Sequence, residues 1–199
     1  MTTTQAPKAP LLNIANALTV LRLVMVPVFV VLMLREGQGA RMAAALVFML
    51  AAATDRLDGQ LARSRNLVTS FGKIADPIAD KALTLSAFVL LSVAGRLWWW
   101  VTVLIIVREL GITLMRFVML RRAVMAASRG GKLKTALQVT GIFGLLVPWA
   151  AFVPPVLATA LDLTAYVLVG LALVVTLVTG ADYVLKALRL SRADPGGRP

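Results

Sequence analysis

Residues 55–80 read DRLDGQLARSRNLVTSFGKIADPIAD and place four aspartates within one short stretch. Asp55 and Asp58 are three residues apart, and Asp76 and Asp80 are four apart. Residues at these separations share one face of a helix. The spacing therefore predicts two helices, each with a pair of carboxylates on one face.

Small residues share these two faces: Gly59 and Ala62 follow the first pair, and Gly72 precedes the second. Helices that turned the faces toward each other would bring four carboxylates together. Such a cluster at a membrane boundary must be neutralised, and divalent cations do so. Ligands that are all oxygen suit Mg²⁺ or Mn²⁺. Ion pairs are the alternative, although they would not require small residues on the same faces. The candidate cations are Arg56, Arg63, Arg65 and Lys73.

The full pattern is Asp-x2-Asp-Gly-x2-Ala-Arg-x8-Gly-x3-Asp-x3-Asp. It resembles, without a gap or a substitution, the signature of the CDP-alcohol phosphotransferases, which are membrane enzymes of phospholipid synthesis. The resemblance implies an all-α integral membrane protein with six transmembrane helices around a polar cavity open to the cytoplasm, usually as a homodimer. It also implies a site for two divalent cations, Mg²⁺ or Mn²⁺.

The resemblance also implies a role for each aspartate. Asp55 and Asp76 would bridge both ions, Asp58 would complete one coordination sphere, and Asp80 would lie beside the second ion. Asp80 is also the best candidate for the general base, because the chain has no histidine. A plain ligand role for Asp80, and an ion pair of Arg63 with Asp58, are the alternatives. The residues expected to contact the CDP group are Asp58, Gly59, Ala62, Arg63 and Gly72.

The composition is that of a membrane protein. Of the 199 residues, 59% are hydrophobic and only 15% are charged, whereas about a quarter of a soluble domain is charged. The absence of cysteine excludes disulfides and thiolate metal sites. The net charge of +12 lies mainly in the loops between apolar stretches. Membrane orientation and anionic head groups explain this charge better than nucleic acid does.

Six apolar stretches approach the ~20 residues needed to cross the hydrocarbon core. They are residues 14–34, 40–62, 73–94, 97–121, 134–153 and 160–187. We expect a membrane domain over 13–187, a short cytoplasmic segment over 1–12 and a basic, disordered tail over 188–199. Lysine and arginine are concentrated on the side that carries the aspartates and both termini. The positive-inside rule places that side of the cell membrane in the cytoplasm.

A second group of charges lies in the fourth and fifth stretches. Arg108 and Glu109 stand near the middle of the fourth, and Arg116 lies two turns further along the face of Arg108. Charges at such depth mark functional sites by default, although an arginine–acid pair that serves packing is the alternative. The glycine-containing segment 127–135 suits an anion cradle or, alternatively, a positive-inside loop. The residues expected to bind a phosphate group on the acceptor are Arg108, Arg116, Ser128, Lys132 and Lys134.

Four segments resemble one branch of the family, the phosphatidylglycerophosphate synthases. They are VREL at 107–110, RF at 116–117, SRGGKLKTALQ at 128–138 and NIANALTVLRLVMVP at 13–27. In the last segment a polar stripe at three-residue spacing comprises Asn13, Asn16, Thr19 and Arg22, and Ala15 stands where the family usually has proline. The resemblance implies transfer of the phosphatidyl group of CDP-diacylglycerol to sn-glycerol 3-phosphate, with release of CMP.

Other functions stay open on the sequence alone. A cardiolipin synthase of the same family would use phosphatidylglycerol as the acceptor, and an inositol-phosphate transferase would also need a basic pocket. A cation- or proton-coupled transporter also carries acids and arginines within the membrane. Against transport, the aspartates cluster at one face and no inverted repeat is visible. A purely structural scaffold would leave the aspartate pattern unexplained.

Overall fold

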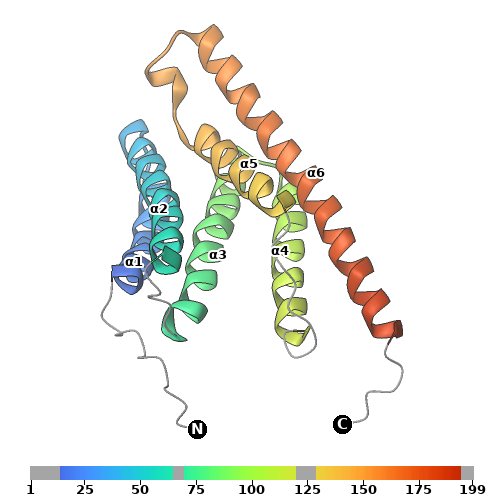
Figure 1. The fold of residues 1–199 in the computed structure, drawn as a ribbon. Helices are drawn as coiled ribbons and strands as arrows, with labels where there is room; N and C mark the ends of the chain where they lie inside the picture. The colour runs from blue at the N-terminus through green and yellow to red at the C-terminus, as the bar shows by residue number, and fades with distance from the viewer. Residues whose placement is uncertain (1–13, 65–69, 120–128, 194–199) are drawn as a thin grey trace. The chain divides into compact units, whose positions relative to one another are not determined.

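The computed structural model describes residues 14–64, 70–119 and 129–193, which are helical apart from short loops. Six α-helices and one 3-10 helix follow one another in this part of the chain, which contains no strand (Figure 1). They are α1 (Ile14–Leu34), α2 (Gln38–Ser64), α3 (Ser70–Val93), α4 (Trp99–Met119), α5 (Arg129–Leu146), η1 (Trp149–Ala151) and α6 (Pro155–Ala193). The predicted all-α class is confirmed for these residues.

The helices form two compact units, and the membrane domain expected over residues 13–187 stays a prediction. The first comprises residues 1–91 and 146–153, and it contains α1, α2, η1 and most of α3. The second comprises residues 92–145 and 154–199, and it contains α4, α6 and almost all of α5. The aspartate pattern therefore belongs to the first unit, and the predicted acceptor residues belong to the second.

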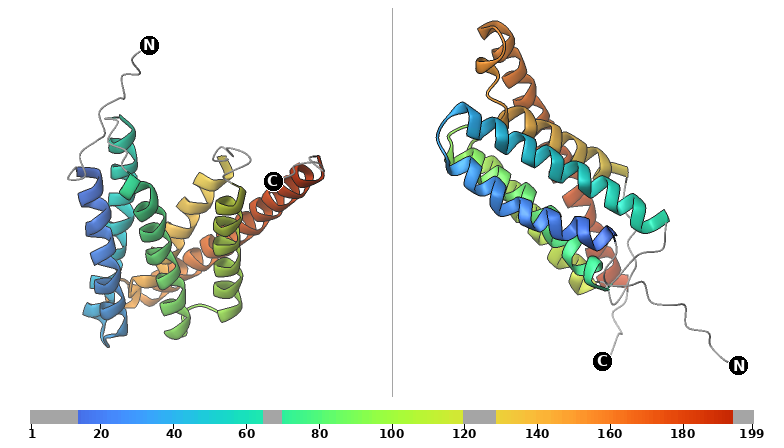
Figure 2. Two further views of the ribbon diagram at one scale, coloured as in Figure 1. Left: turned by 90° about the horizontal axis from the view of Figure 1, so that it is seen from below. Right: turned by 90° about the vertical axis from the view of Figure 1, so that its left-hand side faces the viewer.

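In the first unit α1 and α2 pack against each other as an antiparallel pair (Figures 1 and 2). The chain reverses over residues 35–37, where Gly37 has a φ of 104°, a conformation that favours glycine. Phe29 of α1 contacts Phe48 of α2 with ring centroids 5.9 Å apart, and both are fully buried. Ala44 and Ala45 of α2 are also fully buried. Small side chains at these positions allow close packing between the helices.

The polar stripe predicted on α1 faces the protein interior. Asn16, Thr19 and Arg22 are buried, and Arg22 has no exposed surface at all. The apolar residues Val24 and Val28 are among the exposed ones on the same helix. A guanidinium is costly in contact with lipid, so this orientation places the polar face against protein. Asn13 lies outside the described residues.

In the second unit both α4 and α5 pack against α6. Two glycines of α5 make the second contact possible. A Cβ atom on Gly144 would lie 2.6 Å from the Cβ of Ala165, and one on Gly141 would lie 2.8 Å from Cγ2 of Val169. Contacts this short exclude any larger side chain unless the helices move apart. Small residues at helix interfaces are the usual basis of close packing in membrane proteins.

The connection between α3 and α4 forms two hydrogen bonds with side chains of α6. Gly95, with a φ of 68°, donates its N–H to the Ser92 carbonyl at 3.1 Å, and a left-handed glycine of this kind ends a helix. Arg96 then donates to the Asp162 carboxylate of α6 at 2.6 Å. The Tyr166 hydroxyl of α6 donates to the Arg96 carbonyl at 2.7 Å. This loop is thereby fixed to the N-terminal half of α6.

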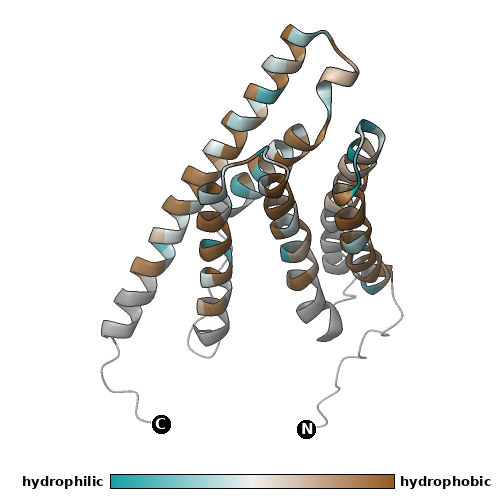
Figure 3. Cartoon of the chain, turned by 180° about the vertical axis from the view of Figure 1, so that it is seen from behind, coloured by the Kyte–Doolittle hydropathy of each residue, from teal (hydrophilic) through white to brown (hydrophobic). Residues whose placement is uncertain are grey.

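Two stretches in the described chain are long and apolar enough to cross a membrane, Asn16–Leu34 in α1 and Pro155–Leu185 in α6. Shorter apolar stretches are Gln38–Thr54, Lys81–Val93 and Leu133–Leu146. Apolar positions, drawn in brown, alternate with fewer polar ones along the helices (Figure 3). These stretches fit the membrane protein that the composition predicts. Six crossings and a cytoplasmic cavity stay predictions.

Helix bounds differ from the predicted ones in α5 and α6. α5 ends at Leu146 rather than at residue 153, because Pro148 has no N–H to continue the helix. α6 begins at Pro155 rather than at residue 160, since proline is favourable in a first turn. It continues to Ala193. Residues 188–193 are therefore helical, where the sequence analysis placed the start of a disordered tail.

Candidate functional site

The aspartate pattern lies on two helices of the first unit. Asp55 and Asp58 stand on α2, and Asp76 and Asp80 stand on α3. Each pair therefore has the helical spacing that the sequence predicts. The side chains of these four residues lie outside the described part of the structure. The same holds for the side chains of Ala62 and Arg63, and for the surroundings of Gly59 and Gly72.

The donor set at these positions fits a divalent cation. The helical backbone continues through both aspartate pairs, so each helix offers two carboxylates on one face. Such a set is made only of oxygen ligands, which hard cations prefer. Among the side chains that the structure does describe, no group of three His, Cys, Asp or Glu residues could hold a metal. The four-aspartate metal site stays a prediction.

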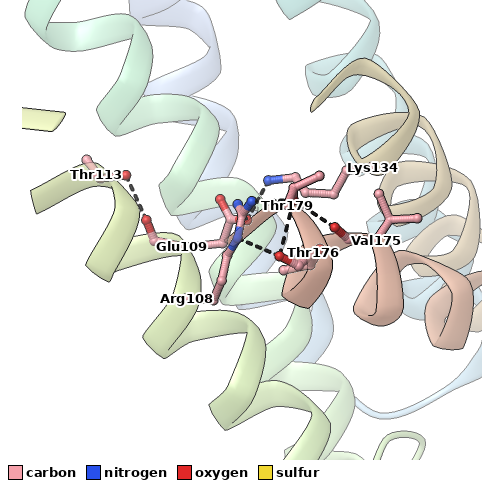
Figure 4. A network of polar contacts seen from close by, with 7 residues as sticks. All are labelled: Arg108, Glu109, Thr113, Lys134, Val175, Thr176 and Thr179. Atoms are coloured by element: carbon pink, nitrogen blue, oxygen red, sulfur yellow. Dashed lines mark hydrogen bonds and ion pairs between the residues drawn. The ribbon is translucent and has the colours of Figure 1, made fainter. Parts of the chain in front are cut away.

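Glu109 of α4 lies at the centre of a buried charge network in the second unit (Figure 4). Its Oε1 accepts hydrogen bonds from Arg108 Nη1 at 2.9 Å and from Lys134 Nζ at 2.5 Å. The side chains of Glu109, Lys134 and Arg108 are 3%, 10% and 12% exposed. A buried charge is tolerated when it is paired and hydrogen-bonded. By themselves these three groups carry a formal sum of one positive charge.

Arg108 reaches from α4 across to α6, where it makes two further hydrogen bonds (Figure 4). Its Nε donates to the Thr176 carbonyl at 2.8 Å, and its Nη2 donates to the Thr179 hydroxyl at 2.6 Å. Gly180 lies against the aliphatic part of the same side chain, since a Cβ there would be 3.1 Å from Arg108 Cγ. The three guanidinium nitrogens thus have three different acceptors, which fix the orientation of its plane.

α5 contributes a polar face to this region. Lys134 and Gln138 are one helical turn apart and both are buried. The Nε2 atom of Gln138 makes no hydrogen bond to any residue within the described ranges. A buried amide without a partner is unfavourable by about 1–3 kcal/mol. The face therefore offers a hydrogen-bond donor to a polar ligand.

The structure brings together two of the five predicted acceptor residues, Arg108 and Lys134. Both contact Glu109, which the sequence analysis noted only as a neighbour of Arg108. Arg116 stands on α4 and Lys132 on α5, but their side chains lie outside the described set. Ser128 lies outside it altogether.

Sequence reasoning missed the contribution of α6. The residues that hold Arg108 there form the segment TLVTG at 176–180. Two threonines and a glycine at i, i+3 and i+4 share one face of an otherwise apolar helix. This spacing was the available signal, but threonine and glycine are common in membrane helices. A partner 71 residues away cannot be identified from such a pattern.

Comparison with known proteins agrees with the aspartate pattern. Residues 12–183 match a family model described as CDP-alcohol phosphatidyltransferase. This range includes α1 to α5 in full and α6 up to residue 183. It also includes every residue that the sequence analysis assigned to the metal, CDP and acceptor sites.

Relatives with similar sequences carry related names. A Mycobacterium tuberculosis protein named "Probable phosphatidylglycerophosphate synthase" is 49% identical over 195 residues, which cover 96% of this chain and 88% of the relative. Two others are named CDP-diacylglycerol–glycerol-3-phosphate 3-phosphatidyltransferase. The one from Bacillus subtilis is 33% identical over 191 residues, covering 87% of this chain and 94% of the relative. The one from Rickettsia typhi is 35% identical over 172 residues, covering 86% of this chain and 94% of the relative. The chain belongs to the CDP-alcohol phosphatidyltransferase family.

Proposed function

We propose that this protein transfers the phosphatidyl group of CDP-diacylglycerol to sn-glycerol 3-phosphate in phospholipid biosynthesis. The products are phosphatidylglycerol phosphate and CMP. Relatives named for this reaction match at least 86% of the chain. The observation that carries the choice of acceptor is the pair of cations, the partly buried Arg108 and the buried Lys134, on the Glu109 carboxylate. A phosphate-bearing acceptor has the charge that this cluster favours.

We assign binding of the nucleotide to the aspartates of α2 and α3. Members of the family generally depend on divalent cations. Two such ions, Mg²⁺ or Mn²⁺, bound by Asp55, Asp58, Asp76 and Asp80, would neutralise charge on the pyrophosphate and the departing CMP. Gly59, Ala62 and Gly72 leave room for the nucleotide, and the forked guanidinium of Arg63 suits one of its phosphates.

The reaction requires one proton acceptor. The oxygen of the 1-hydroxyl group of glycerol 3-phosphate bonds to the lipid-side phosphorus, while the bond from this phosphorus to the CMP oxygen breaks. Asp80 accepts the hydroxyl proton, because a carboxylate is the available base in a chain without histidine. CMP leaves with the electron pair of the broken bond, and phosphatidylglycerol phosphate stays in the membrane.

We assign binding of the acceptor to the charge network of the second unit. Arg108 and Lys134 bind the phosphate group of glycerol 3-phosphate, together with Arg116, Lys132 and Ser128. Arg108 can present a guanidinium edge because α4 and α6 hold its orientation. Gln138, buried one turn beyond Lys134, offers its amide to a hydroxyl of the acceptor.

The membrane arrangement follows from the same proposal. All six α-helices cross the bilayer around a polar cavity that opens to the cytoplasm, with both termini on that side. The enrichment of lysine and arginine in the segments between helices at that side supports this orientation. The protein acts as a homodimer, as is usual in the family.

Metal-dependent release of CMP by the detergent-purified protein tests this function. The protein is incubated with CDP-diacylglycerol and Mg²⁺ or Mn²⁺, with and without sn-glycerol 3-phosphate. We expect release to require both the metal and glycerol 3-phosphate, and to be lost in Asp80→Asn. Asp162→Asn, a partly exposed aspartate of α6 outside the pattern, is the matched control and should keep its activity.

Parallel reactions with other acceptors separate the alternatives. Release that depends on phosphatidylglycerol or on inositol phosphate, but not on glycerol 3-phosphate, would retain the family chemistry and replace the proposed acceptor. No release with any of the three would contradict the proposal. Ion flux into proteoliposomes without lipid turnover would then support transport.

A further inference from the structure

Arg108 is held in place by α6 as well as by its own helix, although the sequence predicts no functional residue on α6. Its side chain begins on α4 and donates hydrogen bonds to the Thr176 carbonyl and the Thr179 hydroxyl of α6, in addition to Glu109. Gly180 contacts the Arg108 stem from the same face of α6. We refer to Thr176, Thr179 and Gly180 as the α6 cradle.

Gly180 gives Arg108 the space that it occupies. A Cβ on this glycine would lie 3.1 Å from Arg108 Cγ, 3.2 Å from Nε and 3.7 Å from Cδ. The first two separations are shorter than ordinary van der Waals contact, so a methyl group would displace the arginine by a few tenths of an ångström. Gly170 on the same helix is exposed and has no atom within 4 Å of its Cβ position. Proximity to Arg108 thus distinguishes Gly180 from an ordinary helix glycine.

Thr179 fixes the direction of the guanidinium. Its hydroxyl donates to the Val175 carbonyl at 2.7 Å, which commits its single proton to the backbone of α6. The lone pairs of the same oxygen therefore face Arg108 Nη2, which donates to it at 2.6 Å. The Thr176 carbonyl accepts from Nε on the adjacent edge. These two contacts set both the position and the rotation of the guanidinium.

We propose that the α6 cradle positions Arg108 for the acceptor, and that Thr179 and Gly180 thereby set the affinity of the enzyme for glycerol 3-phosphate. The inference rests on the proposed function, in which Arg108 binds the acceptor phosphate. Thr179 and Gly180 act through Arg108 and are positioning residues. A phosphate remote from the reacting hydroxyl is bound in the ground state and in the transition state alike. A weaker interaction between Arg108 and this phosphate therefore raises the KM for glycerol 3-phosphate and leaves kcat nearly unchanged.

Initial rates of CMP release for Gly180→Ala and Gly170→Ala test the role of the glycine. For Gly180→Ala we expect the KM for glycerol 3-phosphate to rise about tenfold, as for a weakened hydrogen bond to a charged group. The KM for CDP-diacylglycerol and kcat should stay within about twofold of wild type. Gly170→Ala should match wild type in all three constants. An unchanged KM for glycerol 3-phosphate in Gly180→Ala would overturn the inference, as would an equal rise in both KM values.

A second pair of variants tests the cradle if Gly180→Ala does not fold. Thr179→Val removes the hydroxyl at nearly constant shape, whereas Thr179→Ser retains it. We expect a higher KM for glycerol 3-phosphate in Thr179→Val and recovery of the wild-type value in Thr179→Ser. Thr164→Val is the control, because Thr164 is exposed and bonds only to its own helix at Ala160. Equal KM values in the valine and serine variants would overturn the inference.

The wild-type protein in the same assay separates this inference from the proposed function. If wild type releases CMP without any dependence on glycerol 3-phosphate, the proposed function fails. If wild type depends on glycerol 3-phosphate and the cradle variants do not differ from their controls, only the inference about α6 fails.

Discussion

The aspartate pattern on α2 and α3 and the charge network of α4, α5 and α6 differ in which charge repeats on a helix face and in the sequence distance between their parts. Four aspartates fall within residues 55–80 of the first region. In the second, Glu109 meets Lys134 across 25 residues, and Arg108 meets Thr179 across 71. Two cations there share one carboxylate. Carboxylates that share a helix face favour bound cations, and two cations on one carboxylate suit a bound anion. Under the proposed function each region therefore serves one kind of ligand.

The comparison has a consequence for stability as well. In the proposed function, bound cations neutralise the carboxylates on successive turns of α2 and α3. In the second region the buried charges are paired with each other and with α6. Changes in the first region should therefore affect catalysis, and changes in the second should affect both binding and folding.

The largest effect is expected for Asp76→Asn. The amide keeps the shape of the side chain but removes the negative charge that a metal ligand supplies. CMP release should fall by more than about 100-fold, while the helical circular dichroism and the melting temperature stay close to those of wild type. Retention of most of the activity would show that Asp76 is not part of the site, and that the first region does not serve catalysis as proposed.

Glu109→Gln should have the largest effect on stability. It leaves two buried cations without their shared carboxylate, and removal of one partner from a buried pair lowers the free energy of unfolding by about 3–5 kcal/mol. Denaturant titration of the purified protein, followed by circular dichroism, measures the loss. Glu36→Gln, in the exposed connection before α2, is the control and should change it by less than about 0.5 kcal/mol. A similar small change in both would show that the network does not stabilise the second unit.

Gly144→Ala should destabilise the contact between α5 and α6. The added methyl group would come within 2.6 Å of the Ala165 Cβ, and overpacking of this kind lowers the free energy of unfolding by about 1–3 kcal/mol. Gly111→Ala on α4 has no atom within 4 Å of the new methyl. It should stabilise the protein by up to about 1 kcal/mol, because alanine is the better helix former. One set of melting curves measures both variants, and the changes in their free energies of unfolding should have opposite signs.

The smallest effect is expected for the pair formed by Arg96 and Asp162. Their side chains are 27% and 29% exposed, so water weakens the interaction in spite of the 2.6 Å separation. A double-mutant cycle with Arg96→Gln and Asp162→Asn should give a coupling energy below about 1 kcal/mol. A coupling energy of about 3–5 kcal/mol, the size of the loss expected for Glu109→Gln, would mean that burial does not distinguish the two ion pairs.

Most of the helices could be predicted from the sequence, because long apolar stretches between polar breaks identify them. The bounds of α1 were predicted correctly, since both of its ends fall at clear changes in polarity. The ends of α5 and α6 were not, because Pro148 and Pro155 stop and start helices within apolar sequence. The aspartate pattern could be recognised because local spacing encodes it. The α6 cradle could not, because Thr179 and Gly180 acquire their role only through tertiary contact with Arg108.

The length of α6 has a mechanical consequence. Its 39 residues extend over about 58 Å at 1.5 Å per residue, and the apolar part of 31 residues alone covers about 46 Å. In the proposed arrangement, in which α6 crosses the bilayer, a core of about 30 Å cannot contain that length along its normal, so the helix would lean or the lipid around it would thicken. Hydrophobic mismatch would then act directly on the helix that carries Thr179 and Gly180. The thickness of the surrounding bilayer would then influence the activity of an enzyme whose own product is a lipid of that bilayer.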